Sequence, residues 1–169
     1  GHEEVKQAGI GSVVTPFYIA AQMDNLDMVR YLAGEGHANV NQATTDDGTT
    51  PLYIAAQRDN LDVVRYLAGE GHANVNQART HDGSTPLHIA AQMDNLDVVR
   101  YLAGEGHADV NQAIDDGRTP LYVAAQRENL DVVRYLVGEG HAEVKQARAK
   151  DGSTRLYTAA ENRNLDVVR

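Results

Sequence analysis

The sequence contains no cysteine and no tryptophan, and it has only one phenylalanine and four prolines among 169 residues. Without cysteine, the chain can form no disulfide framework, no thiolate nucleophile and no zinc site of the cysteine type. A chain without disulfides suits a reducing compartment, so we expect an intracellular, cytoplasmic location. No apolar run approaches the roughly 20 residues that a membrane-spanning helix needs, and no signal peptide is visible. We therefore expect no membrane partner.

Positive charge is also scarce. The chain carries 15 lysines and arginines against 24 aspartates and glutamates, which gives a formal net charge of -9. Binding to nucleic acid needs a clustered positive surface, so we expect no nucleic-acid partner. Hydrophobic residues make up 42% of the chain and charged residues 23%, a balance that provides a buried core and argues against disorder.

The main feature that is present is an internal repeat. The dipeptide Thr-Pro begins at residues 15, 50, 85 and 119, and Thr154-Arg155 continues the series, at spacings of 35, 35, 34 and 35 residues. Each occurrence is followed by strings close to TPLYIAAQ, NLDVVRYL and GEGHANVNQA. A period of this length is typical of an array of stacked units, each of which buries its apolar side against its neighbours.

The first half of one unit, residues 50–84, predicts a helix that begins at Thr-Pro. Thr50 can accept a hydrogen bond from an orphan backbone N–H, and Pro51 suits the first helical position, where a missing N–H costs nothing. Leu52, Ala55 and Ala56 then share one face of that helix. The small alanines allow a neighbouring helix to approach closely.

The second half predicts another helix and a short arm. Asn60 can cap the second helix, and the helix is expected to end at Gly69 and Gly71, because glycine is the least strained residue in a left-handed cap. Apolar and polar residues then alternate over 73–76, and Asp82-Gly83 is a turn dipeptide. The expected fold is therefore all-α, with stacked helix-turn-helix units and short β-hairpin arms.

Four motifs recur in phase along the chain. The residues that carry them in the third unit are Thr85, Pro86, Leu87, His88, Ala90 and Ala91 for T-P-L-H-x-A-A; Val98, Val99, Tyr101 and Leu102 for V-V-x-L-L; Gly106, Ala108, Asp109, Val110 and Asn111 for G-A-D-V-N; and Asp116, Gly117, Thr119 and Pro120 for D-G-x-T-P. By these motifs the whole chain resembles the ankyrin-repeat family. It departs from the family in its slightly longer unit, in a tyrosine at the motif histidine of most units, and in Asp59-Asn60 where the family has Gly-His.

The repeat divides the chain as a single array over residues 1–169. We expect residues 1–14 to be the tail of a preceding repeat, complete repeats over 15–49, 50–84, 85–118 and 119–153, and a partial repeat over 154–169. Neither end has the polar cap that a repeat array needs. We therefore expect a segment of a longer array, which could also self-associate through its uncapped ends.

No motif for catalysis, phosphate binding or metal binding is found, so we expect no enzyme activity of the chain's own and no cofactor. Four histidines recur at residues 37, 72, 107 and 141, one repeat apart, which is too far for two of them to share a zinc ion easily. We interpret them as exposed arm residues. The family resemblance marks Asn111 as a candidate for side-chain hydroxylation.

The resemblance implies a protein–protein interaction scaffold that grips its partner in a concave groove of hairpin tips and first helices. The positions that differ between the units of this chain fall in those two places. The candidate contacts are Asp46, Thr49, Arg58, Arg79, His81, Ser84, Met93, Asp115, Arg118, Arg127 and Lys150. Their cations favour an acidic partner segment. Two other interpretations remain open: an interaction segment of a larger enzyme, and a consensus-type designed scaffold with no native partner.

Overall fold

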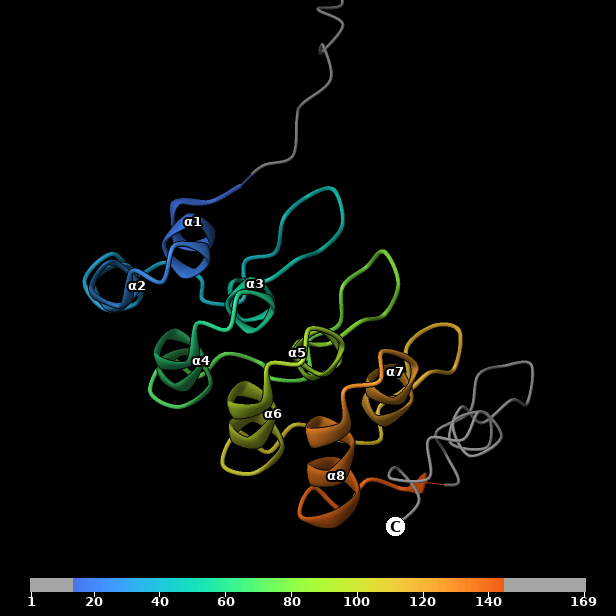
Figure 1. Ribbon diagram of the computed structural model, residues 1–169. Coiled ribbons are helices and arrows are strands. Elements are labelled where there is room, and N and C mark those ends of the chain that lie inside the picture. The colour runs from blue at the N-terminus through green and yellow to red at the C-terminus, as the bar shows by residue number, and fades with distance from the viewer. Residues whose placement is uncertain (1–13, 145–169) are drawn as a thin grey trace, which may run out of the picture.

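A computed structural model of the chain describes residues 14–144, and these residues form a single file of helix pairs (Figure 1). The helices are α1 (Pro16–Gln22), α2 (Leu26–Ala33), α3 (Pro51–Gln57), α4 (Leu61–Ala68), α5 (Pro86–Gln92), α6 (Leu96–Ala103), α7 (Pro120–Gln126) and α8 (Leu130–Gly138). The expected partial repeat at residues 154–169 and the expected tail at 1–13 lie outside the described residues.

The helices form two parallel rows. The first helices α1, α3, α5 and α7 make one row and the second helices α2, α4, α6 and α8 make the other, and the loops that join successive units project beyond the first row (Figure 1). Each helix packs on its own partner and on the same helix of the neighbouring units that the structure describes. This arrangement confirms the all-α solenoid that the repeat predicts.

Threonine and proline start every first helix. The side-chain oxygen of Thr50 accepts a hydrogen bond from the backbone N–H of Tyr53 at 3.1 Å, and Pro51 occupies the first turn. The same cap begins α1, α5 and α7. The prediction for the start of the first helices is therefore confirmed, because a cap of this kind depends only on neighbouring residues.

The second helices begin after an asparagine at the N-cap, as predicted, but in three of them the asparagine side chain has another role. Asn60 stands at the N-cap of α4, but its side chain makes no capping bond and instead donates to the backbone oxygens of Ala21 and Gln22 in the preceding unit. Asn95 and Asn129 do the same one and two units further on. At these three positions the asparagine therefore joins two units rather than capping its own helix.

The ends of the second helices also differ from the prediction. The left-handed residue is His72, with a φ of 53°, whereas Gly69 has a φ of -91°. The glycines are needed for close approach, because a Cβ on Gly71 would lie 3.0 Å from Cα of Leu67. Histidines 37, 107 and 141 share the left-handed backbone of His72.

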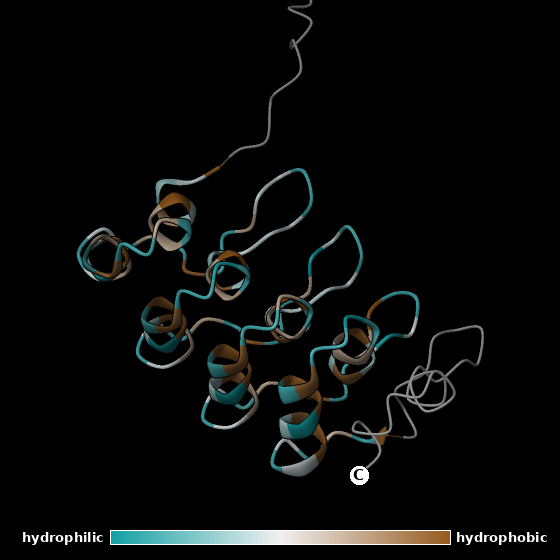
Figure 2. Cartoon of the chain, viewed as in Figure 1, coloured by the Kyte–Doolittle hydropathy of each residue, from teal (hydrophilic) through white to brown (hydrophobic). Residues whose placement is uncertain are grey.

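The core lies between the two rows and continues from unit to unit (Figure 2). Leu52 and Leu67 are buried, and Ala55 and Ala56 have no exposed surface, so adjacent first helices pack closely. Their counterparts in the next two units are buried to a similar degree, except that Ala125 is half-buried. Each unit therefore completes the core of its neighbours, as expected for a repeat protein.

The arms form tight loops rather than β-hairpins. Within residues 14–144 the backbone makes no strand. Each loop is closed by a backbone hydrogen bond across its base, from Thr44 N to Thr49 O and from Arg79 N to Ser84 O in the first two loops. The third is closed from Ile114 N to Arg118 O, which makes it one residue shorter and accounts for the single 34-residue spacing.

Candidate functional site

The three loops, here called tip 1 (44–49), tip 2 (79–84) and tip 3 (114–118), are interlocked. The backbone N–H of His81 in tip 2 donates to the oxygen of Asp47 in tip 1 at 3.2 Å, and that of Asp115 in tip 3 donates to Asp82 at 3.1 Å. Gly48 has a φ of 76°, and a Cβ there would lie 2.6 Å from the backbone nitrogen of Thr80. The tips therefore support one another as a continuous ridge.

Arg79 fastens tip 2 to tip 1. Its guanidinium pairs with Asp82 at 2.7 Å within tip 2 and with Asp47 of tip 1 at 3.3 Å. The same group lies over the ring of Tyr53 on α3, 4.8 Å from the ring centroid. One cation thus links two tips and a first helix, in a position that is only partly exposed.

Titration of these groups follows from their contacts. Burial would raise the pKa of Asp47, but hydrogen bonds from Thr49 and Thr44 and the charge of Arg79 outweigh burial, and the pKa is lowered. The pKa of Asp82 is lowered in the same way, against burial, mainly by the hydrogen bond from Arg79. Both aspartates are therefore charged at neutral pH.

A second cation joins tip 3 to the first helices. The guanidinium of Arg118 donates to the Asp116 carboxylate at 2.7 Å and to the side-chain oxygen of Gln126, the last residue of α7, at 3.1 Å. This contact places the tips and the ends of the first helices on one face. The residue after each first helix is exposed, and these four form a series that we call the cap row: Met23, Arg58, Met93 and Arg127.

The tips and the cap row together form the tip face. Most of the candidate contacts lie on it with exposed or partly exposed side chains: Asp46, Arg58, Arg79, His81, Met93, Asp115, Arg118 and Arg127. Thr49 and Ser84 do not belong to this surface, because both are buried and hold the tips together. Thr49 donates its hydroxyl to Asp47, and Ser84 accepts from the hydroxyl of Tyr53. Lys150 lies outside the described residues.

Asn111 has a structural role that the sequence did not reveal. Its side-chain oxygen accepts a hydrogen bond from the backbone N–H of Glu143 in the next arm at 2.8 Å. Asn41 and Asn76 accept in the same way from the arms that follow them. The candidate hydroxylation residue is thus one of a series that ties consecutive arms together.

His88 lies on the same helical position as Tyr53 and Tyr122 and is buried between α5 and tip 3. Its Nδ1 lies 2.7 Å from the hydroxyl of Thr85, and its Nε2 lies 3.3 Å from the backbone oxygen of Arg118. Burial lowers the pKa of His88 to about 4. The imidazole is therefore neutral at neutral pH and acts as a packing and hydrogen-bonding group.

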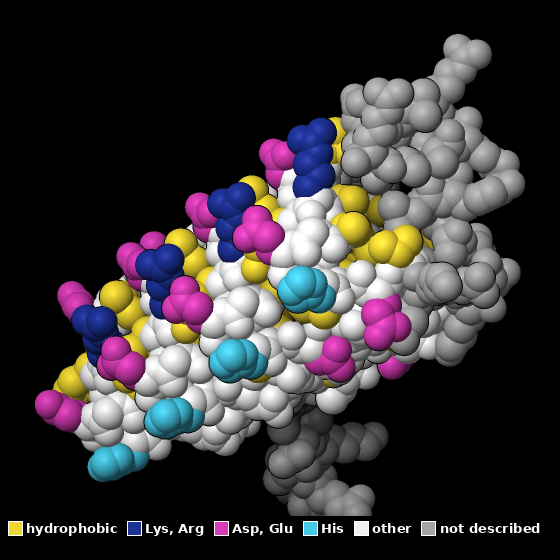
Figure 3. Space-filling view, turned by 90° about the horizontal axis from the view of Figure 1, so that it is seen from below, with side chains coloured by type: hydrophobic (Ala, Val, Ile, Leu, Met, Phe, Trp, Pro, Cys, Tyr) yellow, Lys and Arg dark blue, Asp and Glu magenta, His cyan; other side chains and the backbone are white. Residues whose placement is uncertain are grey.

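The opposite face, formed by the second helices, carries rows of arginine, acidic residues and histidine side by side (Figure 3). Arg65 of α4 lies over the ring of Tyr101 of α6 at 5.8 Å, and the hydroxyl of Tyr101 donates to the backbone oxygen of Arg65 at 3.2 Å. Arg30 and Arg100 lie over the tyrosines of their following units in the same way. The tyrosines thus join units, and the two charges are mixed over this face.

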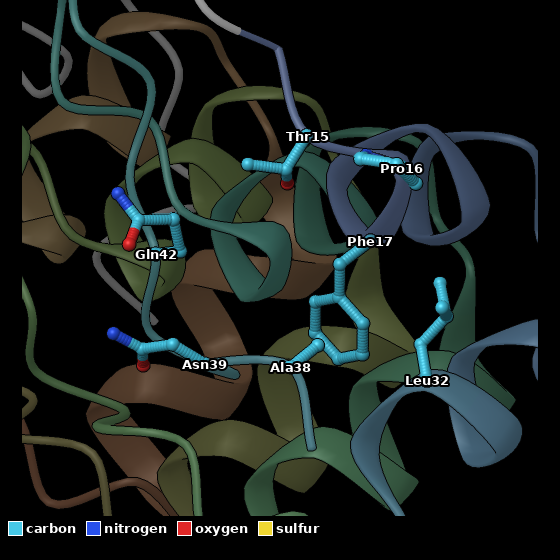
Figure 4. A pocket seen from close by; sticks show the side chains of 7 residues that line it. All are labelled: Thr15, Pro16, Phe17, Leu32, Ala38, Asn39 and Gln42. Atoms are coloured by element: carbon cyan, nitrogen blue, oxygen red, sulfur yellow. The ribbon is translucent and has the colours of Figure 1, made fainter. Parts of the chain in front are cut away.

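The hollows elsewhere in the described part of the chain lie along the helix pairs. Residues 14–144 contain no group of three side chains suited to hold a metal ion. A shallow pocket beside α1 is lined by Phe17, Leu32 and Ala38 (Figure 4). The polar atoms at its edge are engaged locally, because Thr15 accepts from Tyr18 N and Asn39 from Asn41 N.

Comparison with known proteins agrees with this geometry. A family model described as ankyrin repeats in three copies matches residues 17–114 and 106–169. No curated protein matches the chain. None of the helices in residues 14–144 is long and apolar enough to cross a membrane. Ankyrin repeats are in general modules for interaction between proteins. With stacked helix pairs over the described residues and the family match over most of its length, the chain belongs to the ankyrin-repeat family.

Proposed function

We propose that the chain is a non-catalytic scaffold that binds another protein through the tip face. The observation that supports this proposal is the interlocking of the tips. Arg79 links tip 1, tip 2 and α3, and Arg118 links tip 3 to α7. A surface held in this way loses little conformational entropy when a partner binds.

The exposed side chains of this face vary between units, while the aspartate and the glycine of each tip recur in all three. His81 and Asp115 occupy the same edge of consecutive tips, and Met93 and Arg127 occupy the same place after consecutive first helices. A fixed frame with variable exposed contacts can distinguish one partner from another. The mixed second-helix face repeats the same residues in every unit and offers no comparable variation.

The proposal is tested by replacing Arg58, His81 and Arg127 with alanine and measuring the affinity for a protein captured by the parent chain. These side chains are exposed, so the thermal midpoint should change little. Binding to the partner should weaken by about tenfold or more, since arginine is frequent among dominant contacts. Arg118 is left in place because it positions tip 3.

The matched control replaces Arg30, Arg65 and His72, which lie on the second-helix side, with alanine. Like the tip-face variant, it replaces two arginines and one histidine, so the two variants have the same composition. We expect the control to bind the partner as the parent does. If the control loses binding and the tip-face variant keeps it, the proposed face is wrong.

A further inference from the structure

The cap row alternates in chemistry along the array, as methionine, arginine, methionine and arginine. Met23 is 71% exposed and Met93 is 49% exposed, and Arg58 and Arg127 are exposed between and beyond them. The rest of each first helix is nearly the same in every unit. The cap row therefore offers two apolar contacts and two cationic contacts in a fixed order.

The spacing between the side chains of the cap row favours one backbone conformation for a partner segment that binds along it. Packed helices lie about 8–10 Å apart, so successive side chains of the cap row are expected to be separated by about the same distance. A polyproline II segment advances about 9 Å in each turn of three residues, so every third side chain points the same way at this spacing. In an extended strand, side chains three residues apart point to opposite faces.

An α-helix fits the row less well. Side chains seven residues apart advance about 10.5 Å. They also rotate by about 20° in each heptad, so four successive contacts do not remain on one line. Within residues 14–144 the tips form no strand, and so they offer no sheet edge to which a partner strand could be added.

Charge then indicates which residues of the partner segment face the cap row. Arg58 and Arg127 favour acidic side chains of the partner at every second contact, whereas the tips beside them carry net negative charge. Arg79 is shared by Asp47 and Asp82, which leaves one negative charge in excess, and Asp46 and Asp115 are exposed at the outer edge. A uniformly acidic segment would be repelled by the tips, so acidic residues are favoured only where they meet the two arginines.

We propose, on the basis of the function above, that the tip face receives a proline-rich protein segment in the polyproline II conformation. In this segment an acidic residue recurs at every sixth position, and an apolar residue lies midway between two acidic ones. The acidic residues then contact Arg58 and Arg127, and the apolar residues contact Met23 and Met93. The conformation is largely preformed in such segments, which lowers the entropy lost on binding. The sequence predicts an acidic partner segment. Here its acidic residues must also be spaced to match Arg58 and Arg127 of the cap row.

The experiment uses the full chain and a fluorescent peptide of sequence LPPEPPLPPEPPL, whose contacts are in register in either chain direction. A second peptide, LPEPPPLPPPEPL, has the same composition with both glutamates moved out of register. A third, LPPKPPLPPKPPL, reverses the sign of charge. Affinities are measured by fluorescence anisotropy, and the amide signals that each peptide shifts are mapped by NMR.

We expect the in-register peptide to bind about fivefold or more tightly than the other two, which corresponds to two exposed ion pairs. Its perturbations should follow the cap row. Changing Arg58→Glu together with Arg127→Glu should transfer the preference to the lysine peptide. The matched control, Arg30→Glu together with Arg65→Glu on the second helices, changes net charge equally and should leave the preference as it is.

Equal affinity for the two glutamate peptides, absence of binding up to about 1 mM, or perturbations confined to the second helices would each overturn the inference. An α-helical peptide with the same contacts at heptad spacing that binds more tightly would overturn it in favour of a helical partner. The proposed function is separable from these results. A captured protein that depends on Arg58, His81 and Arg127 supports the tip face even if no proline-rich peptide binds it.

Discussion

The side-chain amide of Asn60 donates a hydrogen bond to the backbone oxygen of Ala21, 39 residues earlier, over 2.7 Å. It also donates to the backbone oxygen of Gln22 at 3.2 Å, so one asparagine pairs with two carbonyls at the end of the preceding first helix. In the first unit, Asn25 instead caps its own helix through Met28 N at 3.0 Å. The same residue at the same position thus has two roles.

This difference predicts unequal effects of removing the two asparagines. Asn60→Ala should lower the free energy of unfolding by about 1–2 kcal/mol, because two carbonyls at a buried junction lose their donor. Asn25→Ala removes only an exposed cap and should cost about 0.5–1 kcal/mol. Urea denaturation of both variants measures the two losses. Equal losses would show that the cross-unit bonds contribute no more than an ordinary cap.

The turns between paired helices contain residues with a left-handed backbone, and glycine should relieve the strain at these positions. Glu128 has a φ of 62° and Asp94 a φ of 63°, in the left-handed region where side chains other than glycine cost roughly 1–2 kcal/mol. Glu128→Gly should therefore raise stability by about 1 kcal/mol. Asp94→Gly should raise it less, because aspartate tolerates this backbone better.

The control for this prediction is Arg127→Gly at the neighbouring position, where φ is -91°. Glycine gives no relief of strain there and should lower the thermal midpoint. If Glu128→Gly lowers the midpoint as much as Arg127→Gly does, then the left-handed conformation of Glu128 carries no strain worth relieving.

Arg79 and Arg58 should differ in stability although both lie on the tip face. Arg79→Ala removes two ion pairs and the contact with Tyr53 in a partly buried place, and we expect a loss of about 1–2 kcal/mol. Arg58 is exposed, so Arg58→Ala should change stability by no more than about 0.5 kcal/mol. Chemical denaturation distinguishes them. A neutral effect at Arg79 would mean that the tips do not depend on its contacts.

Much of the fold follows from the sequence, because its signals are local. Thr50 and Pro51 predict where a first helix begins, and the apolar stripe predicts which face is buried. The role of Asn60 was missed because its acceptors lie in another unit. Variation between units predicts Thr49 and Ser84 to be surface residues, yet their hydroxyls are turned inward to hydrogen-bond partners.

The candidate site was predictable only in outline. Variation between units indicated the tips and the first-helix ends, and the bond from Arg118 to Gln126 places the two on one face. The sequence could not show that Arg79 is held by Asp47 and Asp82, because that contact depends on how consecutive tips stack. A count of cations therefore overstated the positive charge that the face presents.

His88 predicts a dependence of stability on pH. Its pKa is lowered to about 4 in the folded chain, mainly by burial, with Asp82 and Arg118 as the nearby charges. An unfolded histidine titrates near 6.5, so between about 6.5 and 4 the unfolded chain binds more protons. Stability is complete above this window and falls by roughly 3 kcal/mol as pH drops through it.

His88→Tyr tests this assignment, since Tyr53 and Tyr122 are buried at the same position in other units. The variant should lose the pH dependence between about 6.5 and 4. The lowered pKa values of Asp47 and Asp82 stabilise the fold above the unfolded aspartate pKa, near 3.9, and that contribution is lost only as pH falls further. Denaturation midpoints of parent and variant across this range measure the difference; parallel curves would contradict the assignment.

The interlocking of the tips restricts how such an array can evolve. Gly48 and the backbone of Thr80 leave no room for a side chain, so a change at Gly48 requires a matching change in the next unit. His81 and Asp46 can vary one at a time, because their side chains are exposed. Duplication of a unit copies residues such as Gly48 that the junctions require. It also supplies new copies of the exposed side chains, which can then change. New binding preferences can thus accumulate at a few positions while the junctions between units stay interchangeable.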